Sequence, residues 1–207
     1  MAYLATLSYG HRARWIPRAV PEAPMTDPEF EVALFPDPVL RKVALPVEIF
    51  DEDLNHTVEA MFERMRASNG VGLAAPQIGL RRRILVLNPT GEPEDDLALI
   101  NVTITDRFGP ESAFEEGCLS FPEIYGEVTR PDSCRVSAQR VDGTSVDLEF
   151  AGFTSRVIQH EYDHLEGVLL VDRMSPADKA RNRPALEALV ADYRERNPKA
   201  RSGGRRR

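Results

Sequence analysis

The stretch from residue 134 to residue 165 changes from one hydrophobic period to another without a break. Its first part, "CRVSAQRVDGTSVDLEF", alternates apolar and polar residues on both sides of Asp142 and Gly143, which predicts a β-hairpin with its turn there. Its second part, "FTSRVIQHEYDHL", changes to the spacing of a helix. A hairpin that leads directly into a helix favours an α+β fold.

The rest of the chain adds short strands and two further helices. Strands are predicted over "RILVLN", "LALINVTI" and "LLVDRM". An N-terminal helix can be capped by Asp51 or Asp53 and ended by Gly70, and a C-terminal helix begins after Ser175 and ends before Asn197. The N-terminal helix has one apolar face, made of Leu54, Val58, Met61, Phe62 and Met65. We therefore expect short, mostly antiparallel strands around the helix at 153–165, with one helix near each end.

Length and charge restrict the class of protein. A chain of 207 residues with 42% hydrophobic residues suits one domain. Because 33 acidic residues outnumber 26 basic ones, a general nucleic-acid binder is excluded and no DNA partner is expected. No apolar run approaches the ~20 residues that cross a bilayer, so no membrane partner is expected. The two cysteines match no CxxC motif, which favours a reducing, bacterial-type cytoplasm.

The two ends differ in composition from the middle of the chain. Residues 1–24 contain Arg12, Arg14 and Arg18 with no acidic residue before Glu22, as in an organellar transit peptide. The alternatives are a poorly ordered extension or a true start at Met25. The end of the chain, "KARSGGRRR", has the composition of a disordered segment. We therefore divide the chain into an extension (1–30), a catalytic domain (31–197) and a basic tail (198–207).

The segment "QHEYDH" carries the first chemical signal. Residues four apart lie on one face of a helix, so His160 and His164 can bind the same metal ion. Glu161 lies one step round the helix, close to a water molecule on that metal rather than to the metal itself. The alternative is a pair of surface histidines, but the apolar neighbours indicate a buried helix, and buried imidazoles need partners.

A metal site of this kind needs a third protein ligand. The protease pattern HExxHxxGxxH agrees with Gly167 but would need histidine where the chain has Leu170. A downstream glutamate ligand would have to be Glu187, which lies among residues expected to face solvent. Cys118 in "FEEGCLSFP" follows a glycine in a turn-like stretch and is the remaining candidate, although a buried structural role is the common one for a free cysteine. Cys134 opens an alternating strand and is expected to be inert.

Three segments together resemble the signature motifs of the peptide deformylase family. They are "GVGLAAPQ" (70–77), "EGCLS" (116–120) and "QHEYDH" (159–164), in the family's order. The resemblance runs from about Val32 to Arg173 and includes "PDPVLRKVALPV"; one departure is "INVTI", where relatives often have proline after the asparagine. The resemblance implies removal of the N-formyl group from the N-terminal formyl-methionine of newly made polypeptides, with release of formate.

The resemblance also implies the metal centre and its base. Cys118, His160 and His164 would bind one divalent ion, with Fe2+ the usual native metal and Zn2+, Ni2+ or Co2+ able to replace it. The metal-bound water would attack the formyl carbon. Glu161 would act as general base and then as general acid, a role that agrees with its position next to His160.

The same resemblance supplies the groups that would hold the substrate. The side chain of Gln77 and the backbone N–H of Leu119 correspond to the family's oxyanion donors. The backbone of Gly70, Val71 and Gly72 would pair with the main chain of the bound peptide, because glycines allow close approach. Gly70 has a second explanation as a helix stop, and both can hold.

The methionine side chain needs an apolar slot on the helix that carries the histidines. Phe153, Arg156 and Val157 lie one or two turns before His160 on the same face. We expect the stem of Arg156 to contribute while its charged head reaches solvent. Ordinary core packing explains Phe153 equally well, because helical spacing does not separate a pocket wall from a core.

Three charged residues are expected to support the site. The family suggests an ion pair between Asp163 and an arginine after "EGCLS", which here is Arg130, and Glu116 would brace the cysteine loop. Two other readings remain: a zinc peptidase, which explains only HExxH, and a binding protein without activity. The basic tail offers a further partner, because counterion release would favour contact with ribosomal RNA; a solvated tail is the alternative.

Overall fold

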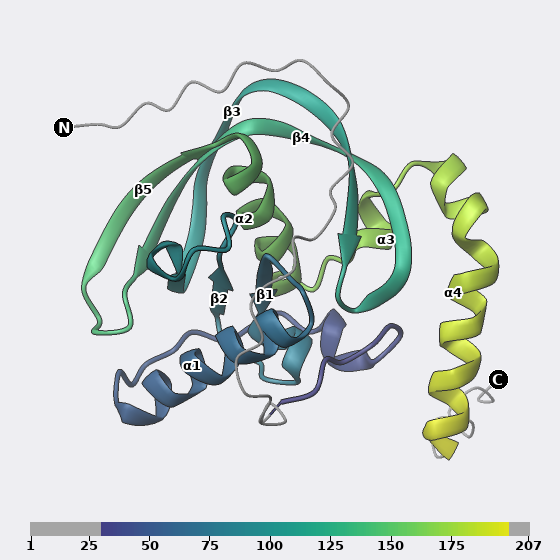
Figure 1. Ribbon diagram of the computed structural model, residues 1–207, viewed down its shortest axis with the longest axis horizontal. Coiled ribbons are helices and arrows are strands. Elements are labelled where there is room, and N and C mark those ends of the chain that lie inside the picture. The colour runs from purple at the N-terminus through teal and green to yellow at the C-terminus, as the bar shows by residue number, and fades with distance from the viewer. Residues whose placement is uncertain (1–29, 199–207) are drawn as a thin grey trace, which may run out of the picture.

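A computed structural model describes residues 30–198 of the chain. The expectations for the extension at 1–29 and for the tail at 199–207 therefore lie outside the described residues. The described part is an α+β fold with one five-stranded antiparallel sheet in the order β1-β2-β3-β4-β5 (Figure 1). This confirms the predicted fold class.

The strands differ strongly in length. They are β1 (Gly72–Ala74), β2 (Ile84–Leu87), β3 (Leu97–Cys118), β4 (Phe121–Gln139) and β5 (Ser145–Ala151). The predicted hairpin is the β4–β5 pair, and Gly143 takes a left-handed φ of 84° in its turn. Shortness holds for β1, β2 and β5, but β3 has 22 residues and β4 has 19. Irregular register between β3 and β4 bends this long pair over the rest of the fold.

The predicted helix with the two histidines is α2 (Gly152–Leu165), and it lies at the centre of the molecule (Figure 1). It contacts all five strands. Val157, Ile158 and Leu165 pack into one core cluster with buried residues of β2, β3 and β4. Since α2 is covered on most sides, its polar residues face other parts of the protein rather than solvent.

The N-terminal helix is α1 (Glu52–Ala67), and its start agrees with the sequence. The Asp51 side chain accepts a hydrogen bond from the Leu54 N–H at 3.1 Å, so Asp51 rather than Asp53 is the cap. Its end differs from the prediction. Asn69, not Gly70, takes the left-handed conformation with φ 54°, and the Gly70 N–H then bonds back to the Met65 carbonyl at 2.8 Å. Asparagine can replace glycine in this Schellman arrangement.

The predicted strand "LLVDRM" is wrong, because these residues form the short helix α3 (Leu170–Arg173). Leu169, Leu170 and Met174 are buried in a cluster with Leu40 and Phe121. A short apolar run is compatible with either a strand or a buried helical turn, and here packing decided for the helix. Three short 3-10 helices complete the fold: η1 (Pro38–Arg41), η2 (Ala75–Ile78) and η3 (Pro93–Asp95).

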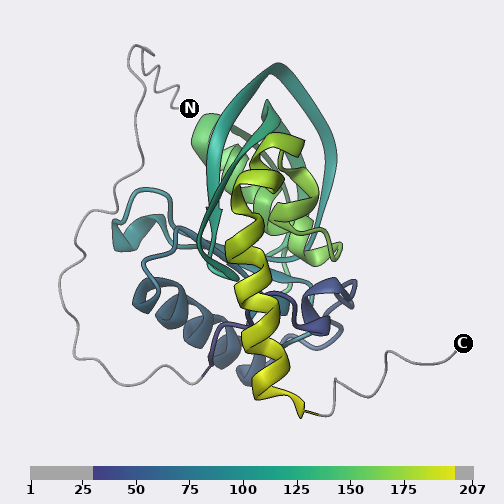
Figure 2. The ribbon, with the colours of Figure 1, turned by 90° about the vertical axis from the view of Figure 1, so that its right-hand side faces the viewer.

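The C-terminal helix α4 (Pro176–Arg196) starts after Ser175, as predicted, and runs along one side of the molecule (Figures 1 and 2). Its first turns are tied to β4, since Asn182 Nδ2 donates to the Tyr125 carbonyl at 2.7 Å.

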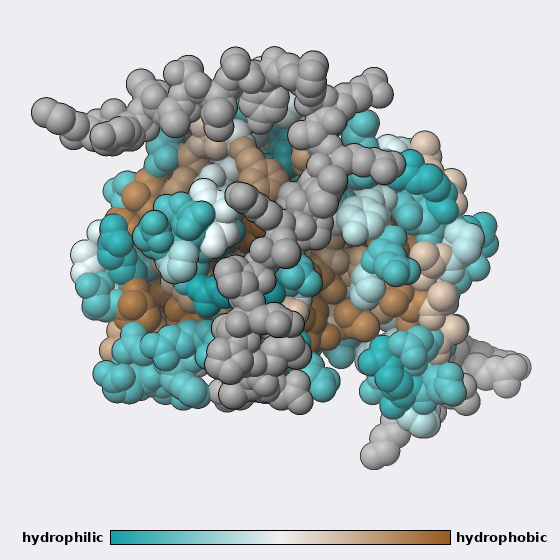
Figure 3. All heavy atoms as spheres, in the orientation of Figure 1, coloured by the Kyte–Doolittle hydropathy of each residue, from teal (hydrophilic) through white to brown (hydrophobic). Residues whose placement is uncertain are grey.

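Hydrophilic residues line the outer side of α1 at the lower edge of the face in Figure 3. None of the described helices is long and apolar enough to cross a membrane.

Candidate metal centre

Three side chains from two elements meet in the middle of the fold. Cys118 is the last residue of β3, while His160 and His164 lie one turn apart on α2. Within residues 30–198, these are the residues whose thiol and imidazole ligand atoms gather within 4.8 Å of one another. Cys118 Sγ lies 3.2 Å from His164 Nε2. The structure therefore brings together the three residues predicted from the motifs.

The donor set suits a divalent transition metal. One thiol and two imidazoles are ligands that zinc, iron, nickel and cobalt accept, and three protein ligands leave a position open. Nδ1 of His164 is buried and has no hydrogen-bond partner among the described residues. Cys134, by contrast, is fully buried in the core cluster beneath α2, as expected of an inert cysteine.

Glu161 is buried beside the cluster, and one of its two carboxyl oxygens lacks a hydrogen bond within the described residues. Only 5% of the residue is exposed, and Oε2 has no hydrogen-bond partner in the described part of the chain. Burial raises the pKa of Glu161 to about 7, against the opposing charges of His160 and Arg130. A carboxyl group with a pKa near neutrality can both accept and donate a proton at working pH.

Glu161 also explains one glycine of the "GVGLAAPQ" segment. A Cβ at Gly72 would lie 2.6 Å from Glu161 Oε1 and 2.8 Å from Val157 Cγ1. Distances below 3.0 Å force one partner to move, so Gly72 provides the space that Glu161 occupies. This contact between β1 and α2 was not foreseen, because nothing in the sequence pairs residue 72 with residue 161.

Glu116 connects the strand pair to the first histidine. Its Oε2 accepts a hydrogen bond from His160 Nδ1 at 3.0 Å, and Arg130 binds both of its oxygens, at 2.8 and 3.0 Å. Burial would raise the pKa of Glu116, but the hydrogen bonds from His160 and Arg130 outweigh burial and hold that pKa far below its usual value. The carboxylate therefore stays ionised, and His160 keeps its proton on Nδ1.

The expected ion pair between Arg130 and Asp163 is present, with Nη1 and Oδ2 2.9 Å apart. Asp163 also binds Arg173, whose Nη2 lies 2.5 Å from Oδ1. The expectation for Arg156 is wrong in one respect: its guanidinium does not reach solvent. It is buried and donates to Glu116 Oε1 at 2.8 Å. Helical spacing placed Arg156 on the correct face but could not indicate its partner.

Gln77 lies on the other side of the cysteine. Its Oε1 accepts a hydrogen bond from the Ala74 N–H at 2.8 Å, which fixes the orientation of the amide. Its Nε2 lies 3.6 Å from Cys118 Sγ and 3.5 Å from Ser120 Oγ, both weak contacts. The amide N–H groups are therefore aimed at the cluster without a strong acceptor. Leu119 follows Cys118 in the turn that joins β3 to β4.

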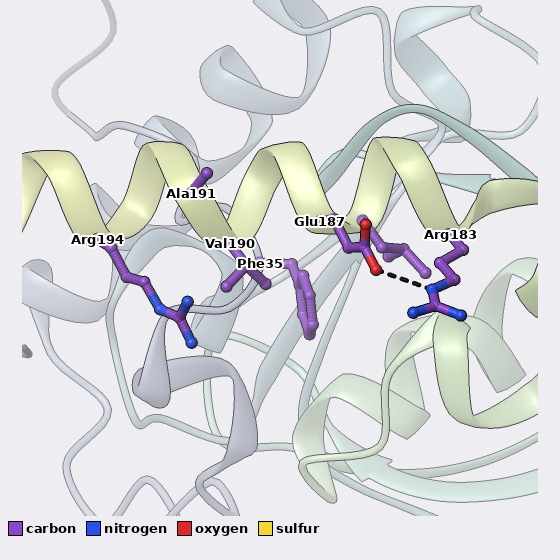
Figure 4. A pocket seen from close by; sticks show the side chains of 7 residues that line it. Phe35, Arg183, Glu187, Val190, Ala191 and Arg194 are labelled. Atoms are coloured by element: carbon purple, nitrogen blue, oxygen red, sulfur yellow. Dashed lines mark hydrogen bonds and ion pairs between the residues drawn. The ribbon is translucent and has the colours of Figure 1, made fainter. Parts of the chain in front are cut away.

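A shallow hollow of about 390 Å³ lies elsewhere, between α4 and the segment before η1 (Figure 4). Glu187 lies in it and binds Arg183, with Oε1 and Nε 2.8 Å apart. Within the described residues, Glu187 is not part of the group around Cys118. The downstream glutamate that a zinc peptidase of the thermolysin kind would need is therefore not at the metal cluster.

The comparison with known families agrees with this geometry. The model of the polypeptide deformylase family matches residues 30–180, which is most of the chain.

The chain belongs to the polypeptide deformylase family.

Individual relatives support this assignment. Peptide deformylase 1B, chloroplastic/mitochondrial, of Arabidopsis thaliana is 43% identical over 180 residues, which cover 84% of this chain and 66% of the relative. The peptide deformylase of Thermotoga neapolitana is 46% identical over 165 residues, 80% of this chain and 99% of the relative. This chain therefore spans about two thirds of the plant relative and nearly all of the bacterial one.

Solved structures give the same result. The crystal structure of a plant peptide deformylase superimposes with a TM-score of 0.79 at 40% identity, covering 84% of this chain and 96% of the other. A peptide deformylase from Plasmodium falciparum also gives 0.79, at 37% identity and with 81% and 99% coverage. Peptide deformylases are metal-dependent hydrolases that remove formyl groups from new polypeptides, and this chain is an enzyme of that class.

Proposed function

We propose that this protein hydrolyses the N-formyl group of formyl-methionine at the start of newly made polypeptides and releases formate. The observation that carries the proposal is the buried Glu161 beside the cluster of Cys118, His160 and His164. A metal ligand set next to a carboxyl group with an unpartnered oxygen provides the groups that metal-assisted hydrolysis of an amide uses.

The same three residues would hold the metal, and we propose Fe2+ as the native ion, with Zn2+, Ni2+ or Co2+ as substitutes. When bound, such an ion lowers the pKa of a water molecule and polarises the formyl oxygen. A thiolate ligand reduces the positive charge of the site more than an imidazole does, which tempers this effect.

Glu161 moves the proton in this proposal. Its carboxylate accepts a proton from the attacking water as the new carbon–oxygen bond forms. The carbon–nitrogen bond then breaks, and the same carboxyl group delivers the proton to the leaving amine of methionine. The raised pKa of Glu161, about 7, supports both steps, because the group neither holds nor releases the proton too strongly.

The developing negative charge falls on the formyl oxygen. We propose that Gln77 Nε2 and the Leu119 N–H stabilise it. The Gln77 amide is held by Ala74 and needs little reorganisation when charge develops. Removing one such donor typically costs roughly 100- to 1000-fold in kcat.

The substrate backbone would add to the edge of the sheet. β1 stands at the end of the strand order and pairs with β2 alone. We propose that Gly70, Val71 and Gly72 pair there with the peptide main chain. Phe153 and Val157, with the stem of Arg156, would line the slot for the methionine side chain.

The direct test is formate release from a formyl-methionyl tripeptide under anaerobic conditions, with bound metal measured on the same sample. Formate in proportion to bound Fe2+ is the expected result. We predict that Glu161→Ala keeps the metal and loses turnover by at least about 100-fold, the usual scale for a general base. Metal-loaded wild-type protein that releases no formate would refute the function, and turnover retained by Glu161→Ala would refute the role of that residue.

Location and a second partner remain proposals. We place the enzyme in a bacterial-type cytoplasm; the name of the Arabidopsis relative favours organelle import as the second candidate. Fusing residues 1–29 to a fluorescent protein and following it in plant cells separates the two. Contact of the basic tail with the ribosome stays a prediction. Cosedimentation with ribosomes, lost when the chain is truncated after Asn197, is the outcome that would support it.

A further inference from the structure

Arg156 is a buried arginine with more hydrogen bonds than a pocket wall would need. It lies on α2, one turn before His160. Its Nη1 donates to Glu116 Oε1 at 2.8 Å and to the Val128 carbonyl at 3.0 Å. Its Nη2 donates to the carbonyl and the hydroxyl of Ser112, at 2.8 and 3.0 Å. One side chain thus joins α2 to both long strands.

The carboxylate of Glu116 is fully occupied by these neighbours. Oε1 accepts from Arg130 Nε and Arg156 Nη1, and Oε2 accepts from Arg130 Nη2 and His160 Nδ1. Two donors on each oxygen leave the carboxylate one orientation. That orientation decides which nitrogen of His160 carries the proton, because Nδ1 donates to Glu116 and Nε2 is left as the possible metal ligand.

Arg130 divides its hydrogen bonds between Glu116 and Asp163. Its Nη1 binds Asp163 at 2.9 Å, so its charge is shared between two carboxylates. Asp163 has a second cation in Arg173, but that arginine is 44% exposed and binds Asp163 rather than Glu116. In the described part of the chain, Arg156 is the second cation that binds Glu116 directly.

We infer that Arg156 is a positioning residue of the metal centre. By holding Glu116 against His160 Nδ1, it keeps His160 Nε2 available as a ligand, and by binding both long strands it fixes α2 relative to the strand that ends in Cys118. The inference rests on the proposed metal site at Cys118, His160 and His164. It gives the guanidinium of Arg156 a role behind the histidine, while the stem keeps its proposed place in the methionine slot.

The test compares Co2+-loaded wild type, Arg156→Met, Arg156→Lys and Arg173→Met. Arg173→Met is the matched control, since it removes an arginine of the same network that binds Asp163 and not Glu116. Four quantities are measured: transfer of Co2+ to a chelator, the visible absorption of bound Co2+, and kcat and KM for formate release per bound metal. Thermal unfolding of the metal-free forms reports stability separately.

We expect Arg156→Met to lose Co2+ roughly 10- to 100-fold more readily than wild type, the usual effect of removing a group that orients a metal ligand. Its Co2+ absorption should shift, and kcat should fall while KM stays within about two-fold. Arg156→Lys keeps a cation but cannot reach Glu116 and Ser112 together, so it should lie between wild type and Arg156→Met. Arg173→Met should retain Co2+ like wild type.

Three outcomes would overturn the inference. The first is wild-type Co2+ retention and absorption in folded Arg156→Met. The second is a raised KM with unchanged metal retention, which would leave Arg156 with a role in the methionine slot alone. If Arg156→Met does not fold, Arg156→Lys decides: lower thermal stability with an unchanged spectrum would mean a purely structural residue. Wild-type protein that binds Co2+ but releases no formate would sink the proposed function alone, because Co2+ retention still tests Arg156.

Discussion

At the scale of single residues, the site depends on space as much as on charge. Gly72 and Glu161 come from β1 and α2, and no side chain at residue 72 fits without moving the carboxylate. The "GVG" segment therefore has a reason for glycine besides the approach of substrate. The missing side chain at Gly72 leaves the space that the proposed base, Glu161, occupies.

Gly72→Ala is expected to lower kcat roughly 100-fold, the cost that a displacement of about 1 Å can have at a reacting centre. The three atoms nearest the new methyl group belong to Glu161 and Val157, and neither is a proposed metal ligand. Bound metal should therefore equal that of wild type. Formate release and metal content on one sample give the answer.

Gly143→Ala serves as the control for general backbone strain. Gly143 also needs its glycine, with φ 84°, but it lies in the β4–β5 turn, where the atoms nearest an added Cβ belong to Phe50. Lower thermal stability with unchanged kcat is the expected result for this variant. Gly72→Ala with wild-type kcat would mean that Glu161 moves without consequence, against the role we propose for it.

Residue identity was predictable at the proposed metal ligands and, through the resemblance, at Glu116, Arg130 and Asp163, but the partner of Arg156 was not. Residues four apart lie on one face of any helix, which is enough to pair His160 with His164. Cys118 is the remaining candidate for the third ligand, and the resemblance implies the same residue. Arg156 occupies the same helical face as a slot residue would. Only the arrival of Glu116 from β3 distinguishes the two roles, and that depends on the tertiary fold.

At the scale of elements, Asp178 joins Asn182 in anchoring the start of α4 to β4. Asp178 Oδ2 accepts from the Glu127 N–H of β4 at 3.0 Å and from the Ser175 hydroxyl at 2.8 Å, and Ser175 Oγ in turn caps the helix. The hydrogen bond from Ser175, followed by that from Glu127, lowers the pKa of Asp178. The ionised form is thus preferred in the folded protein.

Asp178→Asn is expected to reduce the free energy of unfolding at pH 7 by about 1.5–3 kcal/mol, the value of hydrogen bonds to a charged group. Because the folded pKa of Asp178 lies below the unfolded value of about 3.9, its contribution is complete above that pH and is lost as pH falls through the folded pKa. The free energies of unfolding of wild type and Asp178→Asn should therefore converge as the pH falls below about 4.

The matched control for this element is Asp192→Asn. Asp192 lies on the same helix in an exposed i,i+4 pair with Arg196, their atoms 2.6 Å apart. Exposed pairs of this kind contribute about 0.3–0.5 kcal/mol. If the difference in free energy of unfolding between wild type and Asp178→Asn stays the same at low pH, the charge of Asp178 does not cause it.

Periodicity predicted the element type where an apolar face extended over several turns or strand residues, and it failed for the short buried run that forms α3. α1, α2 and the β4–β5 hairpin each have an apolar face that the structure buries. The start of α4 followed instead from Ser175 and Pro176, because Asp178 is the residue of this helix that is buried. The outer part of β3 has mostly exposed residues and contains Gly109 and Pro110, which usually mark a turn. Here Gly109, with φ 82°, lies in a register shift that bends the strand without ending it.

At the scale of the whole molecule, the proposed metal joins two parts that are far apart in sequence. Cys118 ends β3 and the two histidines lie on α2, so a bound ion links the long strand pair to the central helix. The same two parts are joined a second time, behind the site, through Glu116, Arg130 and Arg156. One connection depends on the metal and the other does not.

Removal of the metal should therefore destabilise the whole fold without abolishing it. A ligand present at about 100 times its Kd stabilises the folded state by about 2.7 kcal/mol. For a chain of this size that corresponds to a fall in Tm of roughly 5–11 °C on chelation. The Arg and Glu groups behind the site remain paired, so the metal-free protein should still unfold in one cooperative transition.

The measurement is thermal unfolding of wild type and Cys118→Ser, each with excess Zn2+ and after treatment with a chelator. Wild type should show the full difference between the two conditions. Cys118→Ser should show a smaller one, because a hydroxyl is a poor substitute for a thiolate ligand. Equal differences in the two proteins would remove Cys118 from the ligand set. A wild-type Tm that does not respond to the chelator would mean that the cluster does not link β3 to α2 through a metal.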